Sequence, residues 1–167
     1  MQPTRRRKQL VTKTITVPGN FQRACDDFNA GRFFESHEHI EEIWQYETGP
    51  VRDAYKGLIQ IAAAFVHFTR GNHFGTERLL RTALGYLAPY RTEGAMGFDI
   101  EAIASAAEGI FSQVVAGGPE NLSSVDVSGR PVYKFDRTKL ALESRKWNAW
   151  GFSESGEPLE MEITVAE

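Results

Sequence analysis

The spacing of hydrophobic residues changes twice along the chain. Hydrophobic and polar residues alternate without a fault over residues 159–165, and Val11, Ile15 and Val17 follow the same period of two near the other end. Such alternation is typical of β-strands. Between these tails, hydrophobic residues recur every three or four positions, which is the period of an α-helix. The pattern therefore predicts a helical body with one strand in each tail.

Five hydrophobic stripes with helical spacing lie between the tails, and Gly, Pro or Asn residues separate them. They cover residues 21–28, 33–44, 51–69, 79–87 and 100–115. The third stripe is hydrophobic on nearly all sides, which is typical of a central, buried helix. Asp99 is suited to cap the fifth helix, and the glycines at 117–118 end it.

The first two helices and the next two align with each other at an offset of 40 residues. Phe28 then falls on Phe68, Gly31 on Gly71, and Phe34 on Phe74. A glycine in this position ends a helix in a left-handed conformation, and we expect the flanking aromatic residues to close the hairpin. The repeat resembles a tetratricopeptide pair, although its period exceeds the usual length of about 34 residues. We therefore predict an all-α fold of two antiparallel helix hairpins plus a fifth helix, with a small β element formed by the two tails.

We expect three parts along the chain: an N-terminal arm and strand at 1–17, a helical domain at 18–118, and a C-terminal extension at 119–167 that packs on the helical domain. Residues 131–135 have the pattern of a further short strand. The aromatic-rich stretch at 140–152 has two interpretations. It covers a hydrophobic groove of the helical domain, or it forms an exposed patch for a partner or a second subunit.

Composition narrows the class of protein. The 167 residues carry a formal net charge of −3, which argues against a dedicated nucleic-acid binder. The longest hydrophobic stretch is too short for a membrane span. The single cysteine, Cys25, permits no internal disulfide, so we expect a reducing, cytoplasmic location. The arm at 1–13 has five basic residues and no acidic one, whereas 154–167 has five glutamates and no basic residue, which favours pairing of the tails.

A polar cluster interrupts the hydrophobic stripes of the second and third helices. His37 lies on the hydrophobic stripe of its helix, and Glu41 follows one turn later. Gln60 and His67 share a face of the next helix, with small alanines between them. A buried polar side chain without a partner costs about 1–3 kcal/mol. We therefore expect the two pairs to contact each other, and Glu38 lies at the edge of this cluster.

Three interpretations of the cluster stay open. The first is a hydrogen-bonded network that only fixes the packing of the helices. The second is a pocket for a small polar molecule. The third is a metal site with His37, Glu41 and His67 as ligands, which would make the protein a metal-dependent hydrolase with Glu38 as base. The His-Glu-x-x-His signature of zinc enzymes is incomplete here, because its second histidine is missing.

Two segments carry a resemblance to a known family. They are Phe-Asn-x-Gly-x-Phe-Phe-Glu-x-His-Glu-x-x-Glu-Glu-x-Trp at 28–44 and Gly-Leu-Ile-Gln-x-Ala-Ala-Ala at 57–64, followed by Arg-Gly-Asn at 70–72. The chain thereby resembles domain-of-unknown-function family number 309 over about residues 20–90. The resemblance implies a compact all-helical domain and supplies no activity. The positions that match the family pattern and bear on a site are His37, Glu38, Glu41, Trp44, Gln60 and Asn72.

Taken together, these features predict a binding or interaction module without a cofactor, whose ligand site uses the family-type residues between the second and third helices. The partner would be a small polar ligand or a protein, and neither a nucleic acid nor a membrane. A homodimer is compatible with the many hydrophobic positions. The metal-dependent hydrolase is the alternative from a different class of function.

Overall fold

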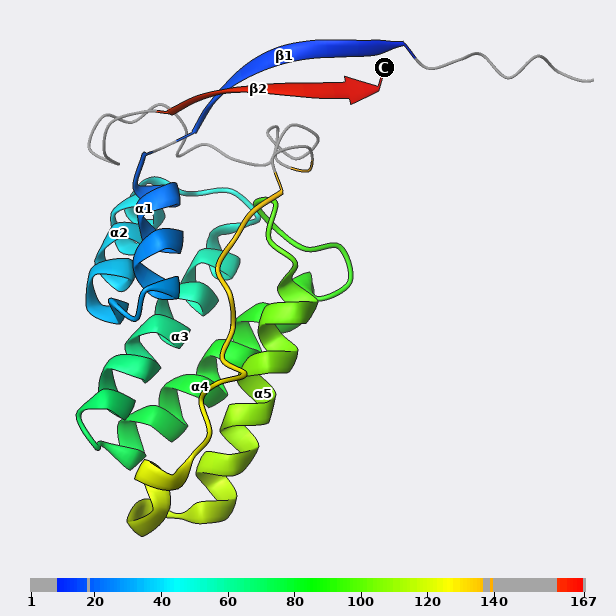
Figure 1. Ribbon diagram of the computed structural model, residues 1–167. Coiled ribbons are helices and arrows are strands. Elements are labelled where there is room, and N and C mark those ends of the chain that lie inside the picture. Colours follow the sequence, from blue (N-terminus) through cyan, green and yellow to red (C-terminus); the bar gives the residue numbers. More distant parts are fainter. Residues whose placement is uncertain (1–8, 18, 137–138, 140–158, 167) are drawn as a thin grey trace, which may run out of the picture.

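The computed structural model describes residues 9–17, 19–136, 139 and 159–166, and Figure 1 shows their arrangement. The elements, in chain order, are β1 (Leu10–Val17), α1 (Gly19–Asn29), α2 (Phe33–Tyr46), α3 (Arg52–Thr69), α4 (His73–Leu87), the 3-10 helix η1 (Ala88–Tyr90), α5 (Ile100–Gly117), the 3-10 helix η2 (Pro119–Ser124) and β2 (Leu159–Ala166). The body is helical, so the predicted all-α class is confirmed. No helix among the described residues is long and apolar enough to cross a membrane.

The two helix hairpins turn at equivalent glycines, as the 40-residue repeat predicts. Gly31 joins α1 to α2 with a φ of +83°, and Gly71 joins α3 to α4 with a φ of +72°. Both angles lie in the left-handed region, which residues with a Cβ rarely adopt. The backbone N–H of each glycine donates to a carbonyl near the end of the preceding helix, that of Phe28 or Phe68. The glycines thus end one helix and let the next fold back on it.

The aromatic residues of the repeat do not close the hairpins in the way we expected. Phe28 is buried, but Phe34 is 49% exposed and Phe74 is 73% exposed. The residue that points inward is the one before: the Phe33 ring packs on Phe28 and Phe65, with ring centroids 5.2 and 5.1 Å apart. Successive residues of a helix point about 100° apart, so Phe34 is turned away from the core.

Helix α3 lies at the centre of the core, as its all-round hydrophobic pattern predicts. It packs against α2 on one side and α4 on the other. Its largest buried side chains are those of Tyr55, Leu58 and Ile61. Helix α5 packs on α4 and begins at Asp99, whose carboxylate accepts a hydrogen bond from the Ala102 N–H and caps the helix.

The two tails form the predicted β element. Strands β1 and β2 pair antiparallel, with Leu10 opposite Ala166 and Val17 opposite Leu159. Figure 1 shows this ribbon at the end of the helical body where α1 begins. The prediction for 140–152 lies outside the described residues.

Residues 125–136, which we call the strap, run in extended form along the helices from η2 (Figure 1). The predicted strand at 131–135 is wrong: Phe135 makes one isolated bridge to Phe98, and no ladder continues from it within the described part of the chain. The reason is that the backbone of this segment bonds to a side chain and not to another strand. The Asn29 amide donates to the Tyr133 C=O and accepts a hydrogen bond from the Tyr133 N–H.

Three buried acidic groups predict a loss of stability at high pH. Burial, reinforced by Asp26, raises the pKa of the Cys25 thiol from 9.0 to about 12. Burial also raises the pKa of Tyr55 and of Tyr133 well above 10. The unfolded chain loses these protons first, so the stability present below pH 9 falls as the pH rises toward 12.

We therefore expect the urea midpoint to fall steadily between pH 8 and pH 11. A Cys25→Ala variant should show a shallower decline, because one of the three groups is gone. Equal slopes for the variant and the unmodified protein would contradict the contribution of the thiol.

Candidate ligand site between helices α2 and α3

Two stripes of mixed polar and apolar side chains face each other where α2 packs on α3, and we call this contact the α2–α3 seam. Its members are Phe34, His37, Glu41 and Trp44 on α2, and Lys56, Gln60, Ala63 and His67 on α3. Within each stripe the residues are three or four positions apart, so they share one face of the helix. The Phe34 end of α2 meets the His67 end of α3, and the Trp44 end meets Lys56, because the helices run in opposite directions.

At one end of the seam, two cations cover the Trp44 ring. The Arg52 guanidinium lies 4.1 Å from the ring centroid and the Lys56 ammonium 4.6 Å from it. Both distances fall within the range of a cation–π interaction. The indole Nε1 is buried and has no hydrogen-bond partner among the described residues. This end of the seam is therefore positively charged around a donor that is not used.

At the other end, the seam opens into a pocket of about 190 Å³. Its lining is mostly apolar and consists of Phe34, His37, Ala63, Val66, His67 and Arg70. A hollow of about 290 Å³ at the turn between α1 and α2 shares three of these residues. The half-exposed Phe34 ring stacks on His37, with centroids 6.1 Å apart and an interplanar angle of 27°. The pocket therefore has an aromatic wall and a cationic rim at Arg70.

His37 stands between the pocket and the rest of the seam. Its Nε2 lies 3.4 Å from a carboxylate oxygen of Glu41. A neutral imidazole that donates from Nε2 leaves Nδ1 as an acceptor. That Nδ1 is buried without a partner, as is Oε1 of Gln60, the next polar residue along the seam. With the Trp44 indole, the seam contains three buried polar atoms that make no hydrogen bond within the described residues.

His67 is held by the start of α4 and not by α2. Its Nδ1 lies 2.9 Å from the side-chain nitrogen of Asn72. The Asn72 side-chain oxygen accepts a hydrogen bond from the Gly75 N–H and so caps α4. A Cβ on Gly75 would lie 2.7 Å from the His67 ring, so the glycine makes room for it. Asn72 thus uses both ends of its amide in positioning His67 and starting the helix.

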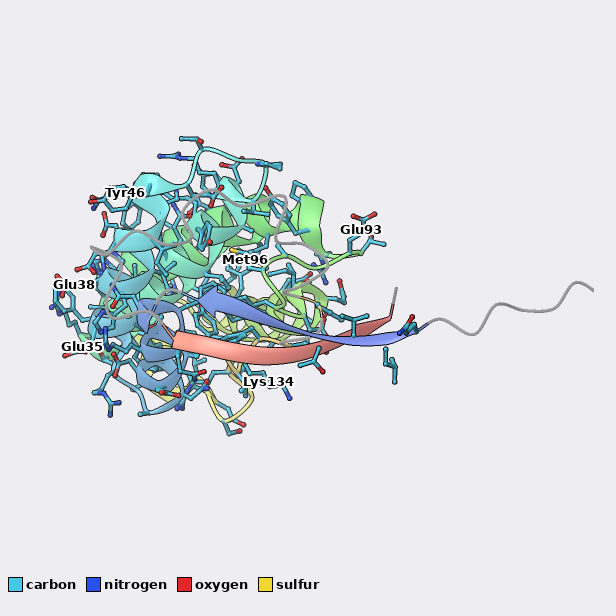
Figure 2. All side chains as sticks on the ribbon, turned by 90° about the horizontal axis from the view of Figure 1, so that it is seen from above. Glu35, Glu38, Tyr46, Glu93, Met96 and Lys134 are labelled. Atoms are coloured by element: carbon cyan, nitrogen blue, oxygen red, sulfur yellow. The ribbon has the colours of Figure 1, made fainter. Side chains whose placement is uncertain are left out.

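The structure therefore brings only part of the predicted cluster together. The contact between His37 and Glu41 forms, but the expected hydrogen bonds from this pair to Gln60 and His67 do not. The reason is that the His67 ring bonds to Asn72 and packs against Gly75, where there is no Cβ, so it lies beside the start of α4. Glu38 is exposed, and Figure 2 shows it with Glu35 at the outer edge of the helical body.

The candidate metal ligands do not converge. Within the part of the chain that the structure describes, no group of three His, Cys, Asp or Glu side chains is arranged to hold a metal ion. His37 and His67 line the same pocket, but Glu41 is not among its lining residues. A zinc site needs three protein ligands about 2.0–2.2 Å from one ion.

Sequence reasoning did not place three of the surrounding residues at the seam, although Arg70 belongs to the Arg-Gly-Asn segment of the family resemblance. Phe34 and Arg70 line the pocket, and Arg52 covers the indole. Arg70 makes no ion pair or side-chain hydrogen bond with another described residue. The sequence could have indicated this position of Arg70, because it directly precedes the turn glycine Gly71. A residue there lies at the end of α3, next to the start of α2.

The fold and the seam define an all-α protein of helix hairpins with a small, mostly apolar pocket at one end of the contact between α2 and α3. The sequence profile of the family described as "Domain of unknown function (DUF309)" matches residues 21–79. This segment runs from α1 into α4 and is similar to that family, which confirms the resemblance inferred from the motifs.

Two curated relatives also match the chain. An uncharacterized protein of Bacillus subtilis (strain 168), YpuF, is 32% identical over 91 residues, which are 53% of this chain and 52% of the relative. An uncharacterized protein of Aquifex aeolicus (strain VF5) is 33% identical over 58 residues, 34% of this chain and 17% of the relative. The chain thus spans about half of the first relative and less of the second. No solved structure gives a significant match.

Proposed function

We propose that this protein is a binding module and that the α2–α3 seam is its ligand site. The observation that supports the proposal is a set of three buried polar atoms that make no hydrogen bond with any described residue: Nδ1 of His37, Nε1 of Trp44 and Oε1 of Gln60. Folded proteins satisfy most buried polar groups, and exceptions call for an explanation. A ligand that supplies the missing partners accounts for all three atoms.

The hydrogen-bonding character of these three atoms indicates which groups the ligand must carry. His37 and Gln60 offer acceptors and Trp44 offers a donor, so the ligand needs hydrogen-bond donors and an acceptor. The adjoining pocket of about 190 Å³ has room for a small apolar group against Phe34 and Val66. A small polar molecule with an apolar end, or the side chain of a partner protein, has this composition.

The proposal predicts that Gln60→Leu stabilises the unliganded protein. Leucine removes the unsatisfied Oε1 and keeps a similar volume, so we expect the free energy of unfolding to rise by about 1 kcal/mol in urea titrations. The matched control is Gln113→Leu on α5. Gln113 makes two hydrogen bonds to the backbone of Asp126, so this change should lower stability. A loss of stability in Gln60→Leu would mean that the amide is already satisfied.

Binding itself is tested by a thermal-shift screen of small alcohols and amides against the full chain. We expect some of these compounds to raise the midpoint of the unmodified protein by a few degrees and to leave Gln60→Leu unaffected. Native mass spectrometry of the hits should show one molecule per chain. Equal shifts in both proteins would place the binding elsewhere and contradict a ligand site in the seam.

A further inference from the structure

The strap lies on a surface made by α1 and α3, the first helices of the two hairpins, and by α5. Its residues bond to α1 through Asn29, to α3 through the carbonyl of Leu58, and to α5 through Gln113. Figure 1 shows the strap running along the body between α1 and α5. Proteins built from stacked helix pairs use the surface that several helices form together for binding.

Two side-chain amides bind the strap through its backbone. The Asn29 amide donates to the Tyr133 C=O at 2.7 Å and accepts from the Tyr133 N–H at 2.8 Å. The Gln113 amide donates to the Asp126 C=O at 3.3 Å and accepts from the Asp126 N–H at 2.9 Å. An amide that pairs with both groups of one residue does not depend on that residue's side chain. These two contacts therefore recognise the extended backbone of the strap and do not select its side chains.

Side-chain specificity comes from alternate positions of the strap. Pro131 and Tyr133 are buried and Phe135 is half-buried, whereas Val132 and Lys134 are exposed. The Tyr133 ring stacks flat on Phe28, with centroids 3.7 Å apart and an angle of 5°, and its hydroxyl donates to the Leu58 carbonyl at 2.7 Å. Alternate anchoring of this kind is how an extended peptide docks on a protein surface.

The surface is wider than the strap that occupies it. A cavity of about 620 Å³ remains between the strap and the first turns of α5. It is bordered by Val132 and Lys134 on the strap side and by Ala102 and Ala106 on α5. Among the described residues, one edge of the strap is therefore uncovered, and a competing segment can begin to displace it there.

We propose that the face formed by α1, α3 and α5 is a groove for an extended peptide with a buried tyrosine, and that the strap occupies this groove in cis until a partner peptide replaces it. The partner is an extended protein segment of the strap's own chemistry, Arg-Pro-x-Tyr-x-Phe. Arginine fits the first position because Arg130 donates to the Asn29 carbonyl and lies over the Phe33 ring. This site is separate from the α2–α3 seam, and the proposal does not rest on it.

The test uses the full chain with Tyr133→Ala, which weakens the strap, and a fluorescent peptide of residues 125–136. We expect anisotropy to show that the peptide binds Tyr133→Ala at least tenfold more tightly than the unmodified protein, whose groove is filled at high effective concentration. The same peptide with alanine in place of tyrosine should bind at least tenfold more weakly. A second substitution, Asn29→Leu, should remove binding. Equal affinity of the Tyr133→Ala protein for the peptide with tyrosine and the peptide with alanine would overturn the proposal. So would a Tyr133→Ala protein that dimerises, with one copy occupying the groove of the other.

Hydrogen exchange on the unmodified protein supplies a test that does not depend on the folding of the variant. If the strap leaves while the helices stay folded, the Tyr133 amide exchanges at least tenfold faster than the Ile61 amide of α3 without denaturant. Equal exchange rates would show that the strap opens only when the whole protein unfolds. The groove could then never receive another peptide, and the proposal would be wrong.

Discussion

Replacing Tyr133 by alanine is expected to lower the free energy of unfolding by about 3–5 kcal/mol, the range for a large aromatic residue in a core. The Tyr133 side chain is fully buried and stacks on Phe28. Its hydroxyl donates to the Leu58 carbonyl of the central helix. The substitution removes the ring contact and leaves a cavity between α1 and α3. Urea titration followed by circular dichroism measures the effect.

Two further substitutions separate the parts of this effect. Tyr133→Phe keeps the ring and loses one hydrogen bond, so we expect a cost of about 1 kcal/mol. Val132→Ala changes the neighbouring residue, which is 60% exposed, and should stay within about 0.5 kcal/mol of the unmodified protein. If Val132→Ala and Tyr133→Ala had similar effects, the strap would not be anchored by the buried ring.

Replacing Gly57 by alanine is expected to destabilise the protein by about 1–3 kcal/mol, although the same change inside a helix usually stabilises it. A Cβ at Gly57 would lie 2.5 Å from two side-chain carbons of Leu87. Leu87 is fully buried at the end of α4, so its side chain has little space to move. The packing of α3 on α4 therefore reverses the sign that helix propensity alone predicts.

The matched control is Gly109→Ala in the middle of α5. A Cβ there meets no atom within 4 Å, so we expect stability to rise by about 0.5–1 kcal/mol. Adding Leu87→Ala to Gly57→Ala should cost less than the sum of the two single changes, because the clash is relieved. An increase in stability for Gly57→Ala alone would show that α3 and α4 adjust to the methyl group.

Much of the helical body was predictable because its signals are local. The 3.6-residue period, the turn glycines at 31 and 71, and Asp99 as a cap each act over one or two helical turns. The exposed Phe34 and Phe74 were misplaced, although their spacing repeats. The repeat shows that two positions are equivalent but not whether they point inward, and that depends on the angle at which the hairpin closes.

For the candidate site, too, the helix faces were predictable from the sequence, whereas the contacts between them were not. Helical spacing placed His37, Glu41 and Trp44 on one face, and Gln60 on the facing helix. The partners of these residues were not predictable, because each had several polar neighbours within reach. Asn72, a predicted ligand-site residue, caps α4 and holds His67. Its position before a helix indicates the cap, but only the arrangement of α3 and α4 shows the contact with His67.

By itself, the sequence determined the class of fold, the helices and their turns, the strands of the two tails and the resemblance to a family. The tertiary structure decided which polar atoms of the seam make no hydrogen bond with a described residue, and where the strap binds. The contact between Asn29 and Tyr133 joins residues 104 positions apart. No periodicity spans such a distance, since a local pattern records which face of an element is hydrophobic but not which distant segment covers it. That choice depends on the shape that the packed helices present together.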